Sequence, residues 1–134
     1  MKHERLTRKA FEQTLGAWNP VGHAVMAFEN DETAEKARAA LREGGMGDDE
    51  ILVFTSKELE PRINEMLRAT GGGATAGYEI NLMRRYLAMA HEGAGWLIVH
   101  AGEDGASDRI TEVAKRFNAK TAVLYHTLVS EDLV

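Results

Sequence analysis

The chain has 134 residues, which is enough for one domain to bury a hydrophobic core without disulfides or a structural metal. It contains no cysteine, and this excludes a disulfide framework, a cysteine nucleophile and a thiolate zinc site. Sixteen lysines and arginines against 21 acidic residues give a formal net charge of -5, which opposes general attraction to nucleic acids and anionic membranes. We expect a single cytoplasmic domain over residues 1–134, with neither a membrane nor nucleic acid as its partner.

Residues 1–18 are predicted to form an amphipathic helix that precedes the core, because apolar residues recur there at near-helical spacing. The same segment holds a concentration of basic residues: Lys2, Arg5, Arg8 and Lys9. We interpret them as a solvated helix face, and a nucleic-acid-binding arm is the alternative. The Asn-Pro turn at 19–20 separates this helix from an α/β core at 22–128.

The first half of the core is predicted to be a strand, a helix and a strand. "GHAVMAF" at 22–28 is short, apolar and bounded by turn residues, which favours a buried strand. "NDETAEKARAALREGG" at 30–45 has Asn30 or Asp31 as its N-cap and two glycines as its stop, and it is typical of a helix. "ILVFTS" at 51–56 suits a second buried strand.

Residues 57–93 are predicted to form a helical pair, because two apolar stripes flank a glycine-rich joint at 71–77. The sequence of the joint, "TGGGATAG", raises the question of phosphate binding. Phosphate loops run from a strand into a helix, whereas this segment follows a helical pattern and lacks the Lys-Ser/Thr signature. We interpret it as a hinge between two helices.

The second half repeats the first: a strand at 93–102, a helix that follows the acidic loop, and a last strand at 121–128. Two interleaved right-handed crossovers give a ferredoxin-like β-α-β-(αα)-β-α-β fold, an antiparallel sheet with helices on one face, plus the extra N-terminal helix. The alternative is a doubly wound parallel sheet in three layers. The loop "HAGEDGASD" at 100–108 runs from strand to helix and is a candidate anion site, but its carboxylates favour helix capping.

One group of side chains is a candidate ligand site. Alternation along strands puts His23 and His100 on the same face as Trp96 and Tyr125, and in the antiparallel arrangement the two histidines become neighbours. Such a pocket suits a small aromatic or acidic ligand. Two histidines without a nearby carboxylate or thiolate are an incomplete metal set, so we predict no metal and no cofactor. No nucleophile stands out beside a base and no Gly-x-Ser-x-Gly motif is present, so we predict no catalytic residues. The alternative is that this large apolar face is open and is buried in a homodimer.

Two blocks of the chain resemble the bacterial heat-induced general stress protein domains. They are "AVMAFENDETAEKARAALREGGMGDDEILVF" and "YLAMAHEGAGWLIVHAGEDGASDRITEVAKRFNAKTAVLY", within residues 22–56 and 82–128. The resemblance implies a small stress-associated domain with no assigned catalytic residues. The first functional hypothesis is therefore a non-catalytic stress-associated or regulatory domain that self-associates through its open sheet face. The second is a small-molecule-binding protein or minor enzyme that uses His23, His100 and Tyr125.

Overall fold

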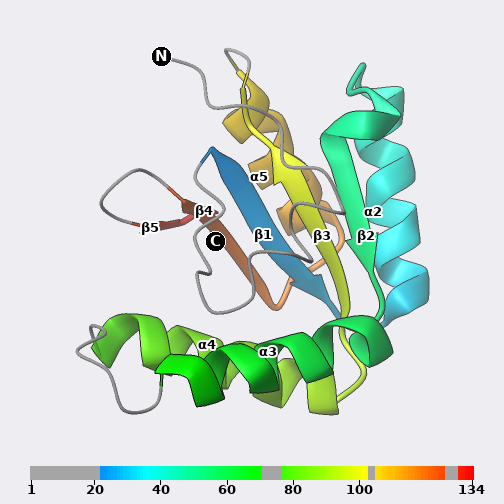
Figure 1. Ribbon diagram of the computed structural model, residues 1–134. Coiled ribbons are helices and arrows are strands. Elements are labelled where there is room, and N and C mark those ends of the chain that lie inside the picture. Colours follow the sequence, from blue (N-terminus) through cyan, green and yellow to red (C-terminus); the bar gives the residue numbers. More distant parts are fainter. Residues whose placement is uncertain (1–21, 71–76, 103–104, 126–129) are drawn as a thin grey trace.

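The computed structural model of the protein describes residues 22–70, 77–102, 105–125 and 130–134 (Figure 1). The described residues form five strands, four α-helices and one short 3-10 helix. In chain order they are β1 (His23–Phe28), α2 (Asp31–Glu43), η1 (Asp48–Glu50), β2 (Ile51–Phe54), α3 (Ser56–Thr70), α4 (Gly77–His91), β3 (Gly95–His100), α5 (Ala106–Arg116), β4 (Thr121–Tyr125) and β5 (Ser130–Asp132). The predicted mixed α/β class is confirmed. The helix predicted at 1–18 and the hinge residues 71–76 lie outside the described residues.

The strands form one sheet in the order β2-β3-β1-β4-β5. Each neighbouring pair is antiparallel, so the described strands do not form the parallel sheet of the alternative prediction. The connection from β1 through α2 to β2 crosses β3, and the connection from β3 through α5 to β4 crosses β1. In the β1–β3 register His23 lies opposite His100, and Phe28 lies opposite Gly95. The end of β3 therefore lies beside the start of β1, at one end of these two inner strands.

Helix α2 begins and ends close to where the sequence predicts. The Asn30 side chain accepts a hydrogen bond from the backbone N–H of Thr33 at 2.8 Å, and Asp31 and Glu32 occupy the first turn. A side-chain acceptor at this position satisfies one of the backbone donors that a helix start leaves unpaired, and acidic residues suit the positive end of the helix dipole. Gly44 follows as the C-cap.

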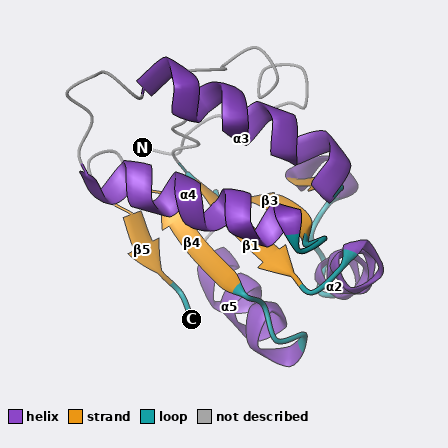
Figure 2. Ribbon diagram, turned by 90° about the horizontal axis from the view of Figure 1, so that it is seen from below, coloured by secondary structure: helices purple, strands orange, loops and turns teal. Residues whose placement is uncertain are grey.

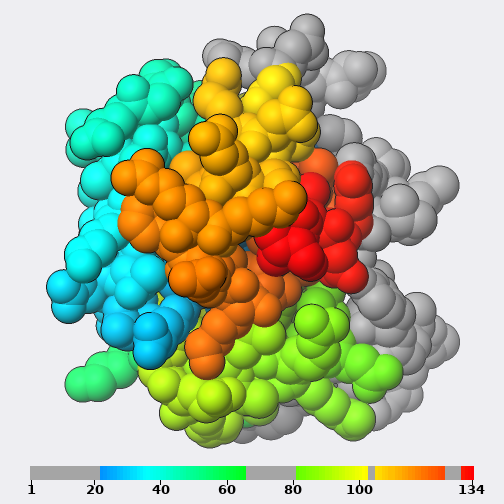
Figure 3. Space-filling model, turned by 180° about the vertical axis from the view of Figure 1, so that it is seen from behind, coloured from blue at the N-terminus to red at the C-terminus, as the bar shows by residue number. Residues whose placement is uncertain are grey.

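Helices α2 and α5 cover one face of the sheet. Their apolar residues, including Ala37, Leu41 and Ile110, share a buried cluster with strand residues such as Met26 and Leu97. Figure 3 shows the two helices next to each other over this face, with the C-terminal segment beside α5. The apolar spacing along each helix gives one stripe that can be removed from water, which is why both dock here.

Helices α3 and α4 cover the opposite face, where the sequence led us to expect an open surface (Figure 2). Trp96 and Ile98 have no exposed surface, and Tyr125 is 8% exposed. The prediction that helices lie on one face only is therefore wrong. The physical reason is that α3 and α4 carry apolar stripes of their own, and burying each large apolar side chain contributes about 1.5–3 kcal/mol. The residues of these stripes are Leu59, Ile63, Leu82, Met83 and Tyr86.

Strand β5 lies at the edge of the sheet, in a C-terminal tail that is too short for the sequence pattern to predict an element. It pairs with β4, with Asp132 opposite Val123 and Glu131 opposite Leu124. Acidic side chains on an edge strand oppose further strand pairing, because the added strand would bury their charge. Among the described helices, none has a stretch that is both long and apolar enough to cross a bilayer.

Candidate functional site

A small pocket lies where β3 ends. This end of β3 is at the top of Figure 1. Two parts of the chain that are far apart in the sequence form its wall: the turn after α2 with η1, and the end of β3 with the first turn of α5. Its volume is about 90 Å³. Its lining residues are Gly45, Met46, Gly47, Glu50, His100, Gly102, Ala106 and Arg109. The polar groups in this wall therefore converge only after folding.

Glu50 and His100 form a close pair in this wall. The Glu50 Oε2 atom lies 2.6 Å from Nδ1 of His100, and the two side chains are 33% and 13% exposed. An ionised carboxylate only accepts hydrogen bonds, so in this pair Nδ1 carries the proton and donates it. A hydrogen bond of this kind fixes both the orientation and the tautomer of the imidazole.

The imidazole of His100 is also held by its neighbours. A Cβ atom at Gly102 would lie 2.5 Å from Cε1 of His100 and 2.8 Å from Nε2, so the ring occupies the space that a side chain there would need. On β1, the ring of His23 lies with its centroid 4.9 Å from that of His100, tilted by 36°. His23 is buried, with 2% of its surface exposed. The His100 ring can therefore lie here only because residue 102 is a glycine.

Arg109 brings a guanidinium group to the pocket, from α5. This helix starts at Ala106, and its N-cap is Gly105, which has a φ of 82° and makes no side-chain capping bond. The sequence predicts that carboxylates of the 100–108 loop cap this helix. Asp108 lies in its first turn, whereas Glu103 and Asp104 lie outside the described residues.

Of the four predicted site residues, the structure brings His23, His100 and Tyr125 to the same end of the sheet, but not Trp96. Tyr125 lies on β4 beside the start of β1, where its carbonyl oxygen accepts a hydrogen bond from the N–H of Gly22 at 2.8 Å. Trp96 pairs with Ala27 and Phe54 near the other end of β3, and it is fully buried. The Tyr125 hydroxyl lies 3.0 Å from that of Tyr86 on α4. Trp96 meets the same Tyr86 edge to face, with centroids 5.2 Å apart. These aromatic residues belong to the core beneath α4, and neither Trp96 nor Tyr125 lines the pocket.

Glu50 and Arg109 are the pocket residues that sequence reasoning missed. Glu50 stands in an acidic turn, where solvation is the ordinary expectation. The register of β2 and β3 is the signal that could have identified Glu50. Ile51 lies opposite Val99, so Glu50 is adjacent to His100. That signal needs the order of the strands, which local sequence patterns do not determine.

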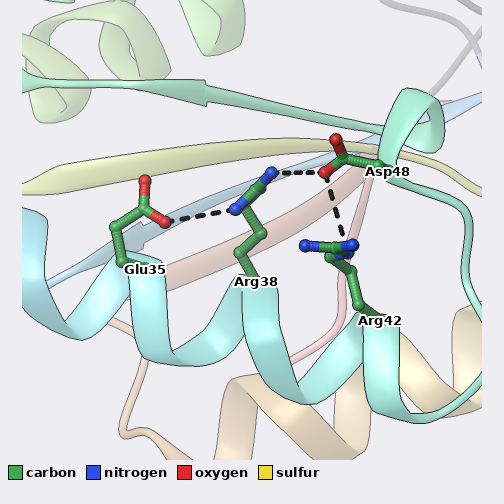
Figure 4. A network of polar contacts seen from close by, with 4 residues as sticks. All are labelled: Glu35, Arg38, Arg42 and Asp48. Atoms are coloured by element: carbon green, nitrogen blue, oxygen red, sulfur yellow. Dashed lines mark hydrogen bonds and ion pairs between the residues drawn. The ribbon is translucent and has the colours of Figure 1, made fainter.

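A surface network holds η1, and with it Glu50, against α2 (Figure 4). Asp48 accepts a hydrogen bond from Arg38, and Nε of Arg42 lies 3.8 Å from the same carboxylate oxygen. Arg38 also contacts Glu35 at 3.4 Å. Each exposed ion pair contributes about 0–1 kcal/mol, so the network orients the turn more than it stabilises the fold.

Comparisons with models of protein families, with curated proteins and with solved structures found no match to this chain. The resemblance to the heat-induced general stress protein domains therefore stays a prediction. Among the described residues, no group of three or more His, Asp or Glu side chains is arranged to hold a metal ion.

Proposed function

We propose that this chain is a small-molecule-binding domain and that its site is the pocket beside Glu50 and His100. The observation that carries the proposal is the 2.6 Å pair between these two side chains in the wall of a concave pocket. Concave sites with a few convergent polar groups are the usual form of small-molecule binding sites. Glycine and alanine form much of the remaining wall, so backbone groups are accessible to a ligand.

The size of the pocket limits the ligand. A volume of about 90 Å³ is room for about three water molecules. Pockets that enclose a drug-sized molecule measure roughly 300–1,000 Å³. The site therefore suits a small ion or the end group of a larger molecule, with the rest of that molecule outside.

The role that the family resemblance implies belongs to the same proposal. A stress-associated or regulatory domain in the cytoplasm would use such a site to respond to a metabolite. The order β2-β3-β1-β4 supports a ferredoxin-like plan, to which α3, α4 and β5 are added. Self-association through the Trp96 and Ile98 face is not part of the proposal, because α3 and α4 bury that face.

The test is a titration of the full chain with a panel of small phosphorylated, carboxylated, cationic and neutral metabolites, followed through the histidine imidazole signals in NMR spectra. We expect at least one compound to shift the His100 signals, and His100→Gln and Glu50→Gln to weaken its binding as measured by isothermal titration calorimetry. The matched controls are His91→Gln and Glu60→Gln, because His91 and Glu60 form a second pair, at 3.1 Å, away from the pocket. A compound that binds all four variants equally would contradict this site.

A further inference from the structure

We infer that His23 and His100 form a pH-sensitive switch at one end of the sheet, where the strands separate when both imidazoles are protonated. The two residues lie opposite each other in the β1–β3 register. Their ring centroids are 4.9 Å apart, and the rings are tilted by 36°. His23 is 2% exposed, and the His100 side chain is 13% exposed. Histidine is the side chain that ordinarily changes its charge between about pH 5 and 8, so mild acid acts on this pair.

Glu50 balances one positive charge on the pair. Its Oε2 atom lies 2.6 Å from Nδ1 of His100. When His100 gains its second ring proton, the imidazolium therefore has a carboxylate beside it, in a charge-assisted hydrogen bond. Among the described residues, Glu50 is the carboxylate that forms an ion pair with either histidine.

Other titratable side chains face the pair from α5, β4 and α4. Arg109 on α5 lines the same pocket as His100, and its guanidinium is always positively charged. Tyr125 on β4 lies beside the start of β1 in the β1–β4 register, and its hydroxyl contacts that of Tyr86 on α4. Phenols ionise only near about pH 10, so both tyrosines are neutral in mild acid. None of these three side chains balances a second imidazolium.

A second positive charge destabilises this arrangement for two reasons. An imidazolium at His23 would be almost completely buried, and burying a charge is costly unless a counter-ion balances it. It would also lie in contact with the imidazolium of His100, and like charges at this separation repel. The His100 ring cannot retreat, because it lies against Gly102, where an added Cβ atom would come within 2.5 Å of Cε1. The repulsion is therefore relieved when β1 and β3 move apart at this end.

Acidification thus lowers the stability of this end of the folded protein. In the unfolded chain both imidazoles bind protons as the pH falls below about 6.5, whereas the folded pair binds fewer. Stability rises with pH wherever the unfolded state binds more protons, so it is highest above this pH and is lost below it. Two backbone hydrogen bonds close this end: Gly22 N–H donates to the Tyr125 carbonyl at 2.8 Å, and Ala101 N–H donates to the Gly22 carbonyl at 2.9 Å.

The experiment measures amide hydrogen exchange of the full chain by NMR at about pH 7.5 and about pH 5, corrected for the intrinsic effect of pH on exchange. We expect the protection of the Gly22 and Ala101 amides to fall about tenfold more in acid than that of Lys120. The Lys120 amide is the internal control, because it donates to the Ala27 carbonyl at 2.7 Å, near the other end of β1.

Three variants identify the groups responsible. His23→Gln should remove the extra loss in acid, because glutamine stays neutral. His91→Gln is the matched control and should retain the loss, because His91 is 59% exposed and pairs with Glu60 away from this end. Glu50→Gln should enlarge the loss, because a carboxylate then no longer balances the first charge. Thermal unfolding shows whether each variant is folded, and Glu50→Gln keeps the test decisive if His23→Gln does not fold.

Three results would overturn the inference. Equal losses of protection at Gly22, Ala101 and Lys120 would mean that acid acts on the whole fold. Unchanged protection between the two pH values would mean that the folded pair tolerates both charges. An unchanged acid response in His23→Gln would place the pH sensor elsewhere. The experiment contains no ligand, so a failure of the switch leaves the proposed function of the pocket standing.

Discussion

Glu50 and His100 are separated by 50 positions in the chain, yet the Oε2 atom of one lies 2.6 Å from Nδ1 of the other. The contact exists because β2 and β3 are antiparallel neighbours, which brings the residue before Ile51 next to the residue after Val99. It joins η1 to the end of β3 in the wall of the pocket. The pair therefore depends on the tertiary fold, and it in turn positions the imidazole that lines the pocket.

Replacing Glu50 with Gln is expected to lower the free energy of unfolding by about 1 kcal/mol, because a neutral amide replaces the charged acceptor of a partly buried hydrogen bond. Urea denaturation monitored by circular dichroism measures the change. The control is Glu60→Gln, whose partner His91 is 59% exposed, and it should cost below about 0.5 kcal/mol. Equal losses of unfolding free energy in the two variants would show that the Glu50–His100 pair stabilises the fold no more than the exposed Glu60–His91 pair does.

Replacing Gly102 with Ala is expected to displace the ring of His100, since the added Cβ would lie 2.5 Å from Cε1. Such overpacking typically costs about 1–3 kcal/mol in unfolding free energy, and here it should also abolish ligand-induced shifts of the His100 signals. Gly44→Ala is the control, because its Cβ would meet its nearest atom, the Leu41 carbonyl oxygen, at 3.4 Å with an ordinary φ of -77°. A stable Gly102→Ala variant with unchanged His100 signals would contradict the observed ring position.

The hydroxyl groups of Tyr86 and Tyr125 are expected to be energetically coupled, because they lie 3.0 Å apart in the buried core. A double-mutant cycle with Tyr86→Phe and Tyr125→Phe should give a coupling energy of about 1 kcal/mol, the usual net value of an intramolecular hydrogen bond. Urea denaturation of the four proteins supplies the data. Strict additivity of the two substitutions would mean that the hydroxyls do not bond to each other.

The indole of Trp96 is expected to be shielded from solvent, because α3 and α4 cover this face of the sheet. The chain has two tryptophans, so a Trp18→Phe variant leaves Trp96 as the fluorescent reporter. Acrylamide should quench its emission weakly in the folded protein and several-fold more strongly in urea. Strong quenching in the folded state would contradict the burial of Trp96 and would support the open sheet face that the sequence predicts.

Local patterns in the sequence predicted those features that depend on neighbours along the chain. The Asn30 cap, the acidic first turn and the glycine stop define α2 because capping is a contact between residues three or four positions apart. Short apolar runs between turn residues likewise predicted the segments that become β1, β2, β3 and β4. The meeting of His23 and His100 also followed from the sequence, once antiparallel pairing was assumed.

Only the tertiary structure decided which surfaces face one another. The sequence showed that α3 and α4 have apolar stripes, but not that these stripes bury Trp96 and Ile98, because docking depends on shape and on competing surfaces rather than on periodicity. The sequence did not predict the pocket for the same reason. Glu50, His100 and Arg109 come from three separate elements, and a side chain in an acidic turn becomes half of a close pair only when the strand order brings it beside its partner.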